Sequence, residues 1–252
     1  MAEIKSSAVQ GGFGRTQRRD AWLLELVPTV ILLGGFGLYA TIRAFEGAYY
    51  SWGPYLSPFY SPLIDAGHKI WPFSPALLIL AGPLGFRVTC YYYRKAYYRA
   101  FFADPPACAV GEPAGRKYKG ETKFPFILQN LHRYFMYLAV IFLCFLWYDT
   151  IRAFWFDGSF GVGVGTLVFL VNIVLLTMYL FSCHSLRHLI GGKLDCFSCT
   201  LSNRTRHGAW KKASFLNERH MLFAWCSLIS VGFADFYVRM VATGMIKDLR
   251  LL

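Results

Sequence analysis

The run GSFGVGVGTLVFLVNIVLLTMYLFSCHSL, residues Gly158–Leu186, contains twenty-nine residues without a formal charge. A helix needs about 20 consecutive apolar residues to cross the hydrocarbon core of a bilayer. Buried helices of soluble domains carry shorter apolar runs, of about 10–14 residues. This run therefore predicts a membrane protein.

The composition of the whole chain agrees with this prediction. The 252 residues are 56% hydrophobic and 18% aromatic, and the mean hydropathy of +0.38 is too high for an ordinary soluble domain. Only 16% of the residues are charged, yet the net charge is +12. Basic charge in so apolar a chain orients a membrane protein more often than it binds nucleic acid, so we expect no nucleic-acid partner. The odd number of seven cysteines argues against a secreted disulfide framework.

Four further apolar runs lie before and after residues 158–186. We predict transmembrane spans at about residues 22–42, 72–93, 126–154, 158–186 and 220–242. The basic segment before the first span carries no cleavage site, so that span is expected to be retained. The predicted fold class is all-α: a polytopic five-transmembrane-helix bundle that forms a single membrane-anchor domain over residues 1–252.

The basic residues indicate how the bundle is oriented. Five spans place nineteen Lys and Arg residues on the side of the N-terminus and six on the opposite side, with Arg87 unassigned. Because cytoplasmic loops of membrane proteins are enriched in Lys and Arg, the N-terminus is predicted to be cytoplasmic. On the opposite side, Asp149 with Arg152 and Asp235 with Arg239 have helical spacing, and we favour ion pairs over a proton path there.

A possible metal-binding segment follows the longest run. HSLRHLIGGKLDCFSC, residues His184–Cys199, has the pattern H-x3-H-x7-C-x2-C. His184 and His188 would share one helix face, and Cys196 and Cys199 have the spacing of a two-thiolate chelate. The Gly-Gly pair between the two halves would end the helix and let the chain double back. Two imidazoles and two thiolates suit either zinc or a Rieske-type [2Fe–2S] cluster.

Several segments resemble one known family. These are LQNLHRYFMYLAVIF at residues Leu128–Phe142, the HSLRHLIGG segment, and the Tyr- and Arg-rich helix before a DPPA loop. They resemble the single-polypeptide five-helix membrane anchor of actinobacterial succinate dehydrogenase (complex II). The resemblance implies a bacterial plasma-membrane protein with no succinate-oxidising activity of its own. It also implies an iron–sulfur subunit on the cytoplasmic face, a flavoprotein subunit beyond it, and menaquinone as the substrate that is reduced.

The histidines and cysteines bear on which cofactor this anchor holds. Anchors of the diheme type place two histidines towards each side of the bilayer, but His68 is the only histidine expected on the outer side here. One inner heme b, bound by two of four histidines, remains the alternative: His132, His184, His188 and His220. Zinc has no redox chemistry, so we favour a Rieske-type [2Fe–2S] cluster as the electron relay, with a structural zinc as a third reading. The role of His207 is open.

Polar residues at the same predicted boundary are candidates for the quinone site. A quinone carbonyl needs a hydrogen-bond donor, and its reduction needs protons from the aqueous side. Aromatic rings can stack on the quinone ring. The candidates open the third and fifth spans, near the cytoplasmic face: Gln129, His132, Arg133, Tyr134, Arg219, His220 and Trp225.

Overall fold

The computed structural model describes residues 12–64, 73–113, 122–124 and 126–252. These residues divide into two compact units, Met1–Leu38 with Val88–Asn130, and Tyr39–Arg87 with Leu131–Leu252. Helix α1 (Val27–Glu46) contributes to both. The single membrane-anchor domain expected over residues 1–252 stays a prediction.

Four helices among the described residues are long and apolar enough to cross a bilayer. They are α1, the helical stretch Ile127–Arg152, α5 (Val164–Phe181) and α8 (His220–Ala242). The stretch Ile127–Arg152 combines a 3₁₀ turn, η3 (Phe126–Leu131), with α4 (His132–Arg152). The predicted span 72–93 contains the shorter helix α2 (Pro75–Thr89), so the count of five spans stays a prediction.

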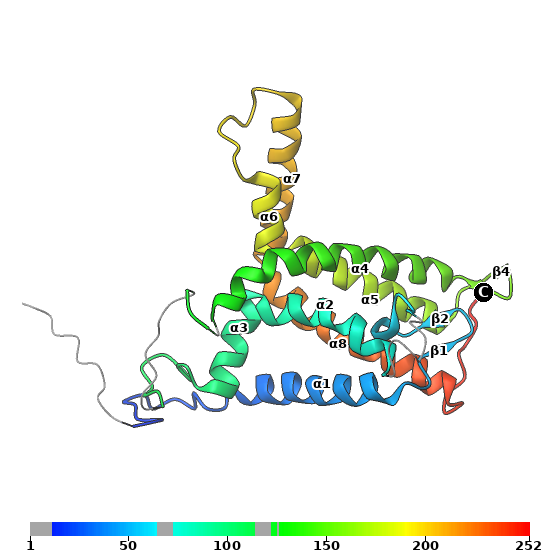
Figure 1. Ribbon diagram of the computed structural model, residues 1–252, viewed down its shortest axis with the longest axis horizontal. Helices are drawn as coiled ribbons and strands as arrows, with labels where there is room; N and C mark the ends of the chain where they lie inside the picture. The colour runs from blue at the N-terminus through cyan, green and yellow to red at the C-terminus, as the bar shows by residue number, and fades with distance from the viewer. Residues whose placement is uncertain (1–11, 65–72, 114–121, 125) are drawn as a thin grey trace, which may run out of the picture. The chain divides into compact units, whose positions relative to one another are not determined.

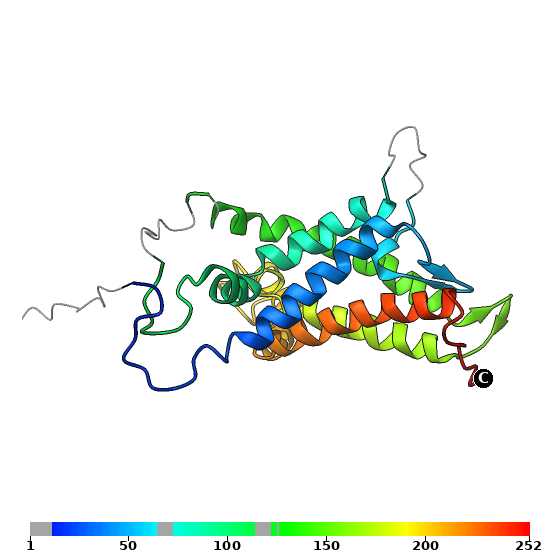
Figure 2. The same ribbon diagram turned by 90° about the horizontal axis from the view of Figure 1, so that it is seen from below.

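The larger unit is built on α4, α5 and α8. Helix α5 packs against both α8 and α4, and the three helices lie side by side in Figures 1 and 2. Helix α2 approaches α4 closely, because a Cβ added to Gly85 would lie 2.1 Å from the Phe135 ring, and one on Gly82 would lie 2.6 Å from the Phe142 ring. Small residues allow such close approach of helices in membranes, where burial of apolar surface contributes little.

One end of this unit is closed by short hairpins. Strands β1 (Ser51–Trp52) and β2 (Tyr55–Leu56) pair antiparallel, as do β3 (Trp155–Phe156) and β4 (Ser159–Phe160). A 3₁₀ turn, η1 (Pro58–Tyr60), follows β2. The hairpins pack on a core made of Tyr55, Ala153, Phe156, Phe169 and Val238. Because β3 and β4 flank an Asp-Gly turn, the helix begins at Val164 rather than at residue 158, where we expected the span to start.

At the other end, two helices form a hairpin that stands off the bundle (Figure 1). They are α6 (His184–Gly191) and α7 (Leu201–Asn217), which pack on each other. The segment that forms α7 is polar and basic. It is helical because Thr200 caps it, accepting a hydrogen bond from the Asn203 N–H at 3.1 Å, and because the Trp210 ring packs on Gly191.

The smaller unit holds the Tyr- and Arg-rich helix that precedes the DPPA loop. Cys90 is extended (ψ 127°), and the chain becomes helical after it as α3 (Tyr91–Tyr97) and a π-helical turn, η2 (Tyr98–Phe102). Within this unit, Thr16 pairs with Val110 in a β-bridge, and the Thr16 hydroxyl donates to the Ala109 carbonyl at 2.7 Å.

Candidate functional site

Two of the residues predicted to bind quinone lie at the end of the bundle where α4 and α8 begin and α5 ends. His132 opens α4 and His220 opens α8, and both are half-buried. Nε2 of His132 lies 3.3 Å from Sγ of Cys183, and the His132 ring stacks on Phe86 with 4.9 Å between ring centroids. The imidazole is thus held on two sides.

His220 is held in a similar way by residues of α5 and the turn after it. Its Nδ1 lies 2.7 Å from the Ser182 hydroxyl, and its ring stacks on Tyr179 at 5.1 Å. The Ser182 carbonyl accepts a hydrogen bond from the Asn217 side chain at 2.7 Å, which ties the end of α7 to the end of α5. Phe86 also meets the Tyr179 ring edge-on at 5.4 Å, so the surroundings of the two histidines share one aromatic wall.

Arg87 completes this group, although it was not among the residues predicted to bind quinone. Its guanidinium lies 4.7 Å from the centre of the Tyr179 ring and donates to the Ala224 carbonyl (3.3 Å) and the Ser227 hydroxyl (3.1 Å). Polar and charged groups inside a bilayer are costly and mark functional positions. We call these side chains the histidine cluster: Phe86, Arg87, His132, Tyr179, Ser182, Cys183 and His220.

A small cavity adjoins the histidine cluster between α2, α4 and α5. Its volume is about 60 Å³, and Phe86, Arg87 and Tyr179 form its polar end. The rest of its lining is apolar: Pro83, Ala139, Phe142, Leu143, Leu146, Leu176 and Leu180. Among the residues that the structure describes, Arg87 is the only charged one that lines it. The site therefore combines an apolar slot with a guanidinium donor and two imidazoles close by.

The other predicted quinone residues are not brought into this cluster. Arg133, Tyr134 and Arg219 are exposed, and the Arg219 guanidinium stacks on Phe215 at 4.3 Å. Trp225 is half-buried in α8. Gln129 belongs to the smaller unit, where its amide donates to the Tyr97 hydroxyl at 3.1 Å.

The predicted metal ligands lie on α6 and on the loop after it. His184 and His188 lie one turn apart on α6, with ring centroids 6.1 Å apart, whereas Cys196 and Cys199 are joined to each other by a disulfide. Across the described ranges, no three His, Cys, Asp or Glu side chains gather closely enough to hold a metal ion. The donor types suit a metal, but the four side chains are not assembled around one point. Binding would require reduced cysteines and movement of the loop.

His207 lies on α7, and its ring packs between two aromatic rings. It stacks on Phe197 of the loop between α6 and α7 at 4.6 Å and on Trp210 at 6.0 Å. The Cys196 carbonyl accepts a hydrogen bond from the Asn203 side chain at 2.9 Å, which ties the same loop to α7. His207 therefore helps to hold the loop that carries the two cysteines. His68 lies outside the described residues.

The environment of His184 leads to a pH-dependent prediction. Desolvation lowers the pKa of His184 from its ordinary value, and the positive charge of Arg187 and the neighbouring His188 lower it further. A histidine with a lowered folded-state pKa binds fewer protons in the folded than in the unfolded state. Its contribution to stability is present above the unfolded pKa of about 6.5 and is lost as the pH falls below it.

We therefore expect amide hydrogen exchange in α6, corrected for intrinsic rates, to be faster at about pH 5.5 than at about pH 7.5. The variant His184→Gln should lose most of this difference. An equal pH response in the variant and the parent chain would show that another group controls it.

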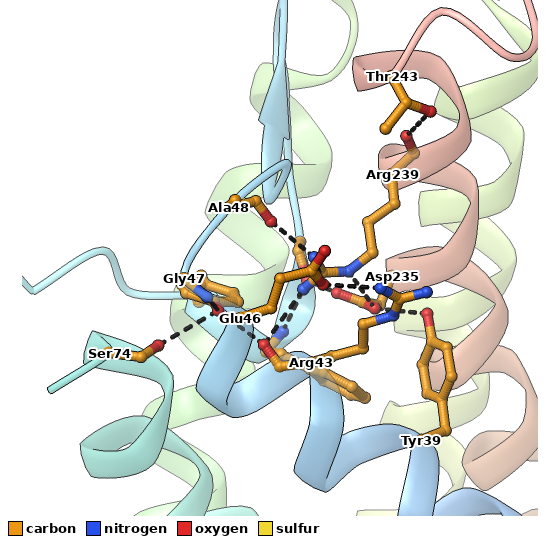
Figure 3. A network of polar contacts seen from close by, with 12 residues as sticks. Tyr39, Arg43, Glu46, Gly47, Ala48, Ser74, Asp235, Arg239 and Thr243 are labelled. Carbon is orange, nitrogen blue, oxygen red and sulfur yellow. Dashed lines mark hydrogen bonds and ion pairs between the residues drawn. The ribbon is translucent and has the colours of Figure 1, made fainter.

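The opposite end of the bundle contains a buried ionic network (Figure 3). Asp235 is 0% exposed and Arg239 is 1% exposed, and their side chains form an ion pair at 2.8 Å. The Asp235 carboxylate also accepts hydrogen bonds from the Tyr39 hydroxyl at 2.6 Å and from Ser57. Arg239 extends the network to Glu46 at 2.8 Å.

This network confirms the ion pair expected between Asp235 and Arg239. Asp149 and Arg152, the second pair expected, make other contacts. Asp149 accepts a hydrogen bond from Ser61, and the Arg152 guanidinium lies over the Tyr148 ring at 5.9 Å. The Asp235–Arg239 network joins α1, α8 and the segment between α1 and β1. Its role is therefore structural.

Four long apolar helices with a polar cluster at one end of the bundle are the arrangement of a membrane protein. The model of the actinobacterial succinate dehydrogenase subunit SdhC matches residues 24–244, and the chain belongs to this family. A solved structure, described as the Mycobacterium smegmatis Sdh1 complex in the apo form, contains a chain that is 44% identical. The match covers 95% of each chain with a TM-score of 0.85. No curated protein sequence matches this chain. The protein is thus a membrane subunit of a succinate dehydrogenase complex.

Proposed function

We propose that this subunit binds menaquinone at the histidine cluster and that the quinone is reduced there. The observation that carries the proposal is an apolar cavity lined by Arg87, whose lining residues Phe86 and Tyr179 stack on the half-buried rings of His132 and His220. A quinone has an apolar ring and two carbonyl oxygens, so it needs an apolar slot with hydrogen-bond donors at its end.

Each residue of the cluster has a role in this proposal. Reduction of a quinone to a quinol consumes two electrons and two protons. The electrons come from succinate through the partner subunits, and the protons come from the aqueous side. Arg87 would donate a hydrogen bond to one carbonyl oxygen, and Tyr179 would contact the ring. His220 and His132 can each carry a proton between Ser182 or Cys183 and the quinone oxygen.

The small volume of the cavity has a consequence for binding. About 60 Å³ holds a few water molecules but no quinone ring. Binding therefore requires neighbouring side chains to move, and Phe86 is placed to do so because it separates the cavity from His132.

We also propose the orientation and partners that the charges indicate. In a bacterial plasma membrane, the histidine cluster and the α6–α7 hairpin would face the cytoplasm. The hairpin presents exposed cations on α7 (Arg204, Lys211 and Lys212) and exposed apolar side chains (Phe197, Leu201 and Phe215). Such a surface suits an iron–sulfur subunit, beyond which the flavoprotein subunit would oxidise succinate. Residues 94–124, of which 114–121 lie outside the described residues, would contribute further cations.

Reporter fusions test the proposed orientation. With the N-terminus inside and five spans, a reporter at the C-terminus should be active only when it works outside the cytoplasm. A cytoplasmic C-terminus would contradict the five-span count. The expectation follows from the excess of basic residues on one side.

A Rieske-type [2Fe–2S] cluster held by His184, His188, Cys196 and Cys199 remains our hypothesis for the electron relay. It is supported by the set of donors, two cysteines and two histidines within sixteen residues. Such a cluster accepts and releases single electrons. One heme b bound by two of the inner histidines is the alternative, and a structural zinc is a third.

The double variant Cys196→Ser with Cys199→Ser distinguishes these cofactors. If the cysteines hold iron, the variant should lose the iron signal and the broad visible absorbance of the subunit, because thiolates are the cluster's ligands. A heme would leave the Soret band unchanged in this variant. A colourless zinc-loaded parent protein would exclude both redox cofactors. Ser198→Ala in the same turn is the matched control and should keep the parent spectrum.

A further inference from the structure

A second hollow lies at the end of the bundle opposite the histidine cluster. It has a volume of about 540 Å³ and is formed by the two β-hairpins and the C-terminal segment. These three segments meet at the same end of the larger unit in Figure 1. The side chains that matter for the argument are Trp52, Arg152, Trp155, Asp157, Asp248 and Arg250.

The walls of this hollow are held in place by backbone contacts. Arg250 pairs with Gly163 in a β-bridge, and the Leu251 N–H donates to the Val162 carbonyl at 2.7 Å. The β3–β4 turn uses positive φ at Asp157 (49°) and Gly158 (85°), the geometry of a tight hairpin. The hollow is therefore formed by paired backbone.

The charges in the hollow are not equally available to a ligand. The Asp248 carboxylate already accepts three hydrogen bonds, from the hydroxyls of Tyr55 (2.7 Å) and Tyr237 (2.6 Å) and from the Gly165 N–H (2.9 Å). Arg152 and Arg250 lie over aromatic rings, and neither forms an ion pair with any residue that the structure describes. Two guanidinium groups can thus bind an anion from solvent or lipid.

In a bilayer spanned by α4, the hollow would lie at the level of the lipid headgroups. Arg152 is the last residue of α4, a helix within a span of bilayer length, and the hairpins begin just beyond it. Trp52 and Trp155 are partly exposed at this level, 38% and 48% respectively. Tryptophan is enriched at the membrane–water interface, where its ring sits among the headgroups.

We infer that this hollow binds the headgroup of one phospholipid, with the phosphate between Arg152 and Arg250. Guanidinium groups bind phosphate oxygens through paired hydrogen bonds. Two arginines and two aspartates leave the lining without net charge, and Asp157 is placed for an amine. The hollow therefore suits a zwitterionic headgroup, phosphatidylethanolamine, better than an anionic one. This site is separate from the proposed quinone site.

Native mass spectrometry of the delipidated intact complex tests this inference. We expect each copy of the chain to bind one dioleoylphosphatidylethanolamine, with at least about tenfold weaker affinity in Arg152→Gln with Arg250→Gln, because two charge-assisted contacts are lost. The control Lys247→Gln removes an exposed cation of the same segment and should bind like the parent. Arg152→Lys with Arg250→Lys keeps both charges and should weaken binding several-fold even if the glutamine variant does not assemble.

Three results would overturn the inference. Equal lipid binding by parent and both double variants would show that the arginines do not hold the headgroup. Displacement of the lipid by millimolar inorganic phosphate would indicate a site for a free anion. Tighter binding of dioleoylphosphatidylglycerol than of the ethanolamine lipid would show that Asp157 does not select a zwitterion.

Discussion

Replacing Arg87 by Gln is expected to lower menaquinone reduction by the purified complex by about 10- to 100-fold. A hydrogen bond from a charged group contributes about 1.5–3 kcal/mol, and each 1.36 kcal/mol corresponds to a tenfold change in rate. Arg87 is the only charged residue lining the cavity at the histidine cluster, so no other lining residue can replace its charge. Succinate oxidation with a soluble dye should be unchanged, because it does not involve this subunit's quinone site.

Two controls separate a quinone role from a structural one. Arg133→Gln removes an exposed cation from the start of α4 and should leave quinone reduction near the parent rate. Ser227→Ala removes one hydrogen-bond acceptor of Arg87 without removing the guanidinium. If Ser227→Ala lowered quinone reduction as much as Arg87→Gln, the guanidinium would act through helix packing. Unchanged quinone reduction in Arg87→Gln would contradict the proposed site.

Replacing Asp235 by Ala is expected to destabilise the subunit by about 3–5 kcal/mol, because it leaves the buried Arg239 without its main partner. The apparent melting temperature of the complex in detergent should fall by roughly 10 °C. Arg43→Gln is the matched control in the same network. Arg43 pairs with Glu46 near the surface, where an ion pair contributes at most about 1 kcal/mol.

A second variant at the same position, Asp235→Asn, tests whether this network carries protons. If Asp235 belongs to a proton path, Asp235→Asn should lower quinone turnover in a complex of parental stability. If Asp235 has only a structural role, the variant should mainly lose stability, and the complex that remains folded should reduce quinone at the parental rate. The closed contacts of Asp235 with Tyr39, Ser57 and Arg239 favour the structural outcome.

The apolar pattern predicted the long helices well, and turn chemistry accounts for most of the differences. Helix α8 spans residues 220–242 as expected, because a long apolar run in a membrane has few alternatives to a helix. The start of the predicted span 158–186 became a β-hairpin because Asp157-Gly158 favours a tight turn. Helix α7 was missed because its residues are polar, and its packing depends on Trp210 meeting Gly191 of another helix.

The candidate site was predicted only in part. His132 and His220 were identified because each opens an apolar run near the predicted membrane boundary. Arg87 was not predicted as a site residue, because the residues that hold it, Tyr179, Ala224 and Ser227, come from helices far away in the sequence. Spacing along the chain cannot show such partners. Spacing likewise did not indicate that the His207 ring stacks on Phe197, ten residues before it.

The position of bound menaquinone tests the central proposal most directly. A cryo-electron microscopy map of the intact complex, prepared with a short-chain menaquinone analogue, would locate the quinone ring. We predict a ring in the cavity between α2, α4 and α5, with one carbonyl oxygen within about 3.2 Å of a guanidinium nitrogen of Arg87. A ring bound elsewhere, with the cavity at Arg87 still closed by Phe86, would contradict the proposal.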